Sequence, residues 1–153
     1  MKRIGLFVDV SNLYYCVSSK YNKKLDYSKL LNYIKDLGKI EAAVAYGAQM
    51  NNEANNFIKC IKEYGYDIRY KEPKSYEKKR KADWDVGITV EVMTRSDEFD
   101  MVVLGTADGD FIPLVEHLLR QNKNVVVLAS GISRELAEIA TKAIEIPESL
   151  LEK

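Results

Sequence analysis

Short apolar runs alternate along this chain with stretches whose apolar residues recur at helical spacing. The strand-like runs span residues 3–9, 40–49, 66–70, 100–105, 124–129 and 143–146. Between the first two runs, Leu30, Ile34 and Leu37 share one helical face. Strands that alternate with helices predict a three-layer α/β/α fold with a mainly parallel sheet and helices on both faces. No linker or repeat divides the pattern, so we expect one domain over residues 1–153.

Two of the predicted strands end in carboxylates. Asp9 ends the first strand, and Asp108 and Asp110 follow the strand at 100–105. In an open parallel sheet, ligands bind beyond the carboxyl ends of the strands. If these strands are neighbours, the three acids converge on one crevice, where two carboxylates about 4 Å apart repel by roughly 4 kcal/mol at an effective dielectric of 20. We therefore expect a hard divalent cation there, either Mg²⁺ or Mn²⁺.

Each of these acids also has a purely structural alternative, which is helix capping. The helix after the first strand has cap candidates in Ser11 and Asn12, and Asp9 is placed to assist them. Asp110 suits the N-cap of the helix that follows it, which leaves Asp108 with no capping role.

The helix predicted at residues 84–94 carries further acids. Asp83 is expected to cap it, and Asp85 lies in its first turn, where the helix dipole favours a carboxylate. Glu91 is six residues beyond Asp85, so the two do not share one stripe of the helix. We expect Glu91 to lie on a solvated face.

The charge of the chain is balanced overall and uneven locally. Lysine and arginine together number 23, as do aspartate and glutamate. Residues 69–81 are nevertheless strongly basic and include Tyr70 and Tyr76. Such a segment can bind RNA through phosphate contacts and base stacking, although a solvated surface loop is the plain alternative. The candidate RNA-binding residues are Lys78, Lys79, Arg80 and Lys81.

Several function classes lack the residues that they need. His117 is the single histidine and lies within a predicted helix, which disfavours a serine or cysteine hydrolase triad. Neither a glycine-rich dinucleotide motif nor a P-loop lysine motif is found. The two cysteines, Cys16 and Cys60, are expected to be buried reduced thiols of a cytoplasmic protein. No apolar run approaches the roughly 20 residues of a membrane helix, so we expect no membrane association.

Three blocks of sequence carry a family resemblance. Residues 7–13 read FVDVSNL, residues 81–91 read KADWDVGITVE, and residues 106–114 read TADGDFIPL. In this order and at this separation they resemble the NYN domains of the PIN-like nuclease superfamily, in particular the LabA-like branch. The sequence departs from the family pattern at Ala107, where glycine is usual, and at Thr106, where serine is usual. Glu91 stands where many relatives have aspartate, and Asp83 is a second candidate beside Asp85.

The resemblance implies a strand order of 3-2-1-4-5, which places the first and fourth strands side by side. It also implies cleavage of single-stranded or structured RNA that depends on Mg²⁺ or Mn²⁺. The implied catalytic residues are Asp9, Asp85, Asp108 and Asp110, of which Asp9, Asp108 and Asp110 would hold the metal. The implied supporting residues are Asn12, Glu91 and Thr106.

Two other functions and one assembly remain open from the sequence. A non-catalytic RNA-binding or regulatory module would keep the same fold and acids. A phosphatase of the haloacid-dehalogenase type would need a second aspartate two residues after the first, where this chain has Ser11. The tyrosine-rich helix around residues 14–21 suits a dimer contact, so a homodimer is also open.

Overall fold

A computed structural model describes residues 1–48, 52–71 and 84–153. Its six strands form one sheet of order β3-β2-β1-β4-β5-β6, and each neighbouring pair is parallel. The strands are β1 (Arg3–Asp9), β2 (Lys39–Ala48), β3 (Asp67–Lys71), β4 (Met101–Gly105), β5 (Asn124–Ala129) and β6 (Lys142–Glu145). The expected order 3-2-1-4-5 is confirmed, and β6 extends it at the β5 edge.

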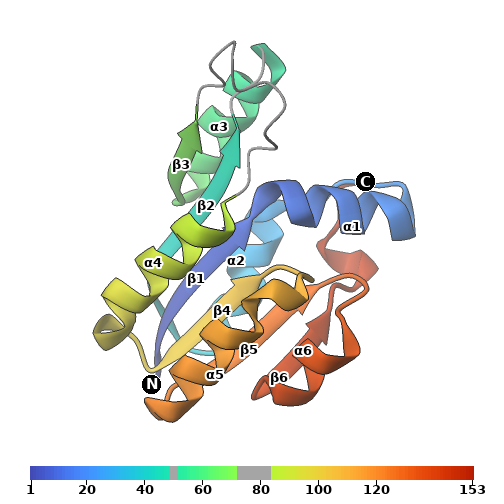
Figure 1. Cartoon of the computed structure of the whole chain (residues 1–153). Helices are drawn as coiled ribbons and strands as arrows, with labels where there is room; N and C mark the ends of the chain where they lie inside the picture. The colour runs from blue at the N-terminus through green and yellow to red at the C-terminus, as the bar shows by residue number, and fades with distance from the viewer. Residues whose placement is uncertain (49–51, 72–83) are drawn as a thin grey trace, which may run out of the picture.

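Helices cover both faces of this sheet, as the alternating pattern predicted (Figure 1). The helices of one face are α1 (Val10–Tyr21), α2 (Tyr27–Lys35) and α3 (Asn52–Tyr64). Those of the other face are α4 (Asp85–Arg95), α5 (Ile112–Arg120) and α6 (Arg134–Ile139). The structure also has three short 3₁₀ turns among its described residues: η2 (Ser96–Glu98) after α4, η3 (Gly109–Phe111) before α5 and η4 (Glu148–Leu150) after β6.

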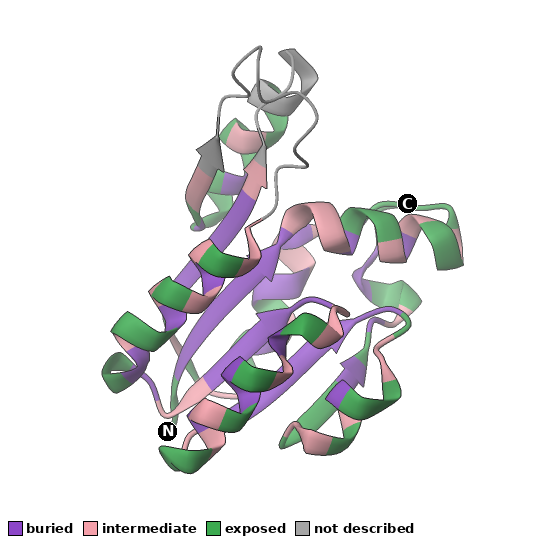
Figure 2. Cartoon of the chain, in the orientation of Figure 1, coloured by how far each residue is buried: buried purple, intermediate pink, exposed green. Residues whose placement is uncertain are grey.

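The core has two layers, and residues of β1 contribute to them in alternation. Figure 2 shows the strand buried along most of its length. Leu6 and Val8 pack among the residues of α1 and α2, whereas Phe7 packs among those of α4 and α5. Side chains of a strand point to opposite faces in turn, so Asp9 has the parity of Phe7. Its carboxylate also caps α1, a helix of the other face.

Two helix caps differ from the sequence-based expectation. Asp9, rather than Ser11 or Asn12, occupies the N-cap of α1 and accepts a hydrogen bond from the Asn12 N–H. Asp108, rather than Asp110, occupies the cap of η3 and accepts from the Asp110 N–H. In both cases the helical segment begins earlier than the local pattern indicated. The N-cap is therefore an earlier residue, Asp9 for α1 and Asp108 for η3.

Two further observations concern exposure and membranes. Cys60 is exposed and Cys16 is half-buried, so the expectation that both thiols are buried was wrong. Cys60 belongs to α3 and lines a cavity that is open to solvent. Within the described ranges, no helix is long and apolar enough to cross a membrane.

Candidate functional site

The carboxyl ends of β1 and β4 lie side by side in the middle of the sheet. Val8 is in register with Gly105, so Asp9 and the loop at 106–110 emerge next to each other. The strands pack tightly here, because a Cβ added to Gly105 would lie 2.5 Å from Val8 Cγ1. The first and fourth strands thus bring together the two acidic segments that the sequence singled out.

Hydrogen bonds fix the shape of the loop after β4. The Ala107 N–H donates to the side-chain oxygen of Asn12 at 2.9 Å, which joins this loop to the start of α1. The buried Thr106 hydroxyl accepts from the Asp108 N–H at 3.2 Å. The Asp108 carboxylate then accepts from the Asp110 N–H at 2.9 Å. Asn12 and Thr106 were both predicted to support the site. They bind the backbone of the loop that carries Asp108 and Asp110.

Three carboxylates meet above this loop. Asp85, Asp108 and Asp110 each place one oxygen within 4.8 Å of the others. Two unit charges at that distance repel by about 1 kcal/mol in water and about 3 kcal/mol at an effective dielectric of 20. Asp110 is exposed and the other two are half-buried, so solvent screens part of this repulsion. A hard cation with oxygen ligands would offset it.

Asp9 is not a member of this group of mutually close oxygens. Asp9 is 8% exposed, and its carboxylate caps α1 through the Asn12 N–H at 3.2 Å. Asp9 is in register with Tyr46 of β2, one residue beyond the last pair that joins β1 to β4. The sequence grouped Asp9 with Asp108 and Asp110, whereas the structure gathers Asp85 with those two. Asp9 as a metal ligand stays a prediction.

Asp85 reaches the site because Trp84 anchors the start of α4. The indole N–H of Trp84 donates to the Gly47 carbonyl at the end of β2, at 3.1 Å. Its ring packs against Tyr46 with 5.4 Å between ring centroids. The indole also lies over Gly87, where an added Cβ would be only 2.8 Å from Trp84 Cε3. A glycine one turn into the helix therefore leaves room for the anchor.

Glu91 is paired rather than solvated, so the expectation of a solvated face was wrong. Its carboxylate contacts Arg69 of β3 at 3.0 Å and Arg95 of α4 at 3.1 Å, and it accepts from the Tyr46 hydroxyl at 2.7 Å. Burial by itself raises the pKa of Glu91, but the bonds from Tyr46, Arg69 and Arg95 outweigh it and lower the pKa. Glu91 ties α4 to β2 and β3 and is not among the three clustered acids.

No local pattern in the sequence indicates that Tyr46, Trp84 and Arg69 lie together. They come from separate parts of the chain, and although Arg69 belongs to the basic segment and Trp84 to a block of the family resemblance, neither pattern relates them to each other or to Glu91. A pairing of Glu91 with Arg95 was readable as an i, i+4 pair, but the partners from the sheet were not. The predicted RNA-binding residues Lys78, Lys79, Arg80 and Lys81, and the second candidate Asp83, lie outside the described residues.

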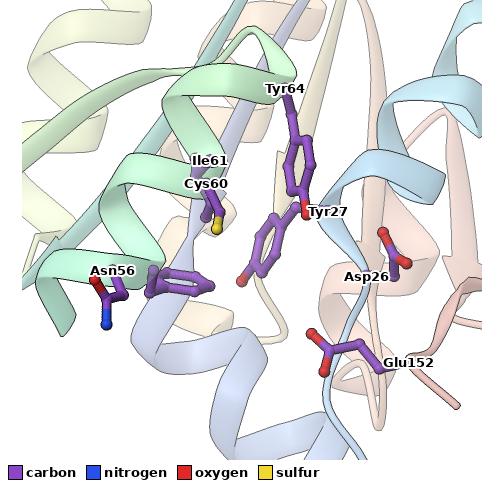
Figure 3. Close-up of a pocket in the computed structure, with 8 residues that line it drawn as sticks. Asp26, Tyr27, Asn56, Cys60, Ile61, Tyr64 and Glu152 are labelled. Carbon is purple, nitrogen blue, oxygen red and sulfur yellow. The ribbon is translucent and has the colours of Figure 1, made fainter. Parts of the chain in front are cut away.

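A cavity of about 310 Å³ lies elsewhere, between α2, α3 and the C-terminal residues (Figure 3). Tyr27, Phe57 and Tyr64 form its aromatic walls, and Asp26 and Glu152 line it as well. Asp26 uses one carboxylate oxygen to cap α2. The cavity belongs to the α1–α3 side of the sheet, and none of the three clustered acids lines it. We therefore place the candidate site at the carboxyl ends of β1 and β4.

Known proteins resemble this chain over nearly its whole length. The model of the NYN domain family matches residues 3–148. The chain is 26% identical to the low amplitude and bright protein LabA of Synechococcus elongatus, over 99% of this chain and 88% of that protein. The crystal structure of a protein of unknown function from Vibrio parahaemolyticus aligns with a TM-score of 0.92 and 28% identity, over 99% of this chain and 96% of that one.

Proposed function

This chain belongs to the NYN domain family, a family of PIN-like nuclease domains, and we propose that it is a ribonuclease that depends on Mg²⁺ or Mn²⁺. The observation that carries this proposal is the meeting of Asp85, Asp108 and Asp110 at the carboxyl edge of the sheet. They come from two segments separated by more than twenty residues. Asp108 also caps the turn η3 through the Asp110 N–H, so one carboxylate serves both the loop and the cluster.

The donor set fits a divalent cation of the hard type. It offers carboxylate oxygens only, without sulfur or imidazole, and such ligands suit Mg²⁺ and Mn²⁺. Asp85, Asp108 and Asp110 would hold the ion, and Asp9, at the end of the neighbouring strand β1, is the candidate for a fourth acid. When bound, a cation of this kind neutralises charge on a phosphodiester and promotes attack by water.

The protein residues around the acids position them and leave the site open. Asn12 and Thr106 fix the backbone of the loop that presents Asp108. Trp84 fixes the first turn of α4 and with it Asp85. Asp110 is exposed and faces the solution from which a polymer would arrive. We propose that the backbone of the RNA is bound in part by Lys78 to Lys81, which precede α4 in the sequence.

The reduced cysteines and the absence of a membrane-spanning helix among the described residues agree with action in the cytoplasm, which we also propose. A single domain spanning residues 1–153 and a homodimeric state complete the proposal. In the part of the chain that the structure describes, every strand from β3 to β6 belongs to one sheet, which supports a single domain.

The test compares the purified chain with its Asp108→Asn variant on labelled RNA in Mg²⁺, Mn²⁺ and EDTA. Asparagine keeps the cap acceptor for the Asp110 N–H and removes the charge, so folding is preserved. We expect cleavage by the wild type in metal and a loss of about 100-fold or more in the variant. Salt-sensitive RNA binding without cleavage would instead support a non-catalytic RNA-binding module. Equal cleavage by both proteins would refute the proposed site.

A further inference from the structure

Two tyrosines near the start of α1 are largely exposed. Tyr14 is 51% exposed and Tyr15 is 71% exposed, whereas Leu13 and Val17 of the same helix are fully buried. Exposed aromatic rings are ordinary when they are single and scattered. This pair differs in two ways. Its two rings are contiguous, and the helix that carries them begins beside the loop of Asp108.

The position of Tyr15 follows from that of Asn12. The two residues are three apart in α1, so they lie on the same side of the helix. Asn12 accepts from the N–H of Ala107, which directly precedes Asp108. Tyr15 therefore lies about one turn further along α1 than the residue that binds the acidic loop, a rise of about 4.5 Å along the helix axis.

The Tyr15 ring is also held in place. The rings of Tyr14 and Tyr15 meet edge to face, with 5.4 Å between centroids and 78° between planes. An edge-to-face contact restricts both rings and leaves at least one flat face of each uncovered by the other. An aromatic face that is fixed and open to solvent is the geometry on which unpaired bases stack.

We propose that Tyr15, supported by Tyr14, is a stacking platform for an unpaired base of the RNA strand that passes Asp85, Asp108 and Asp110. This inference rests on the proposed function and adds to it a contact with a base, which only a strand with unpaired bases can make. In a duplex both faces of each base are covered by its neighbours, so a paired strand cannot use the platform.

The first experiment measures the Kd of a short labelled single-stranded RNA by fluorescence anisotropy, on an Asp108→Asn background so that the RNA stays intact. We expect Tyr15→Ala to weaken binding by about 5-fold to 100-fold and Tyr15→Trp to preserve it. The matched control is Tyr64→Ala, which removes a 46% exposed tyrosine of α3. It should leave the Kd unchanged, as should Tyr15→Ala with duplex RNA.

A second experiment locates the stacked base. An abasic nucleotide is moved along the RNA one position at a time. The Asp108→Asn protein should lose affinity at one particular position, and the additional Tyr15→Ala change should abolish the loss at that position. Unchanged affinity in the Tyr15→Ala protein, or an equal loss for single-stranded and duplex RNA, would overturn the platform.

The outcomes separate this inference from the proposed function. If the wild type cleaves RNA and Tyr15→Ala binds it normally, the platform alone is wrong. If the wild type binds single-stranded RNA through Tyr15 but never cleaves it, the platform stands and the ribonuclease activity does not. If sedimentation finds a wild-type dimer that Tyr15→Ala converts to a monomer, a second copy covers the pair and the platform is overturned.

Discussion

The side-chain oxygen of Asn12 accepts a hydrogen bond at 2.9 Å from the backbone N–H of Ala107, a residue 95 positions further along the chain. This bond joins the first turn of α1 to the loop that carries Asp108. The same turn of α1 is capped by Asp9. The two acidic segments recognised in the sequence are thus connected through one amide side chain.

Replacing Asn12 with alanine should therefore impair both stability and the site. The Ala107 N–H would lose its acceptor, which costs about 1–3 kcal/mol for a buried donor and somewhat less for this half-buried one. Urea denaturation measures that loss. The Asn12→Asp variant retains an acceptor oxygen and should recover most of the stability, so an equal loss in both variants would contradict the role assigned to this bond.

Removing charge from the acidic cluster should stabilise the metal-free protein. Two adjacent carboxylates repel by about 1–3 kcal/mol, so Asp110→Asn should raise the Tm slightly in EDTA. The same variant should lose most of the rise in Tm that Mg²⁺ or Mn²⁺ gives the wild type, because one ligand is gone. Glu138→Gln alters an exposed acid of α6 and should leave both results unchanged.

Trp84 is the single tryptophan of the chain and adjoins Asp85, so its fluorescence reports on the site. Paramagnetic Mn²⁺ bound at the three acids should quench that emission in a saturable manner. The Asp108→Asn variant should need a much higher Mn²⁺ concentration for the same quenching. Quenching that rises linearly and equally in both proteins would indicate collisions with Mn²⁺ and no site.

Gly87→Ala sets two effects against each other. Alanine in a helix interior is ordinarily more stable than glycine by about 0.5–1 kcal/mol. Here its Cβ would lie 2.8 Å from Trp84 Cε3, so the indole must move away from the Gly47 carbonyl. We expect no net gain in stability, a shift in tryptophan emission and weaker metal binding. The control is Val86→Ala, at a position of the same helix that is 78% exposed.

The ion pairs of Glu91 should make stability depend on pH in acid. The folded pKa of Glu91 lies below its unfolded value of about 4.3, so its contribution is complete above that pH and is lost as the pH falls through the folded pKa. Glu91→Gln should cost about 1–3 kcal/mol at pH 7, and the difference from wild type should shrink below about pH 4. Denaturation at a series of pH values measures this. A difference that is constant from pH 7 to pH 3 would exclude a contribution from the charge.

Much of the fold could be predicted from local pattern. Apolar runs of strand length, interrupted by residues such as Leu30 and Ile34 at helical spacing, indicated a parallel sheet with helices on both faces. Resemblance to known domains then gave the order of its strands. The short strand predicted at 143–146 was also found, one residue earlier at Lys142–Glu145, with Ile144 buried although the strand lies at the edge of the sheet.

The residues that lie together at the site were only partly predictable. An acid at the end of an apolar run marks the end of a buried strand, so Asp9 and Asp108 could be found from the sequence alone. The structure clusters Asp85, rather than Asp9, with Asp108. Asp85 is brought there by the position of α4, whose first turn is anchored to β2 by the hydrogen bond from Trp84. Glu91 was misjudged because Arg69 and Tyr46, which hold it, come from other strands. Sequence spacing determines which side chains share an element, whereas distances between elements are set by the packing of the whole sheet and its helices.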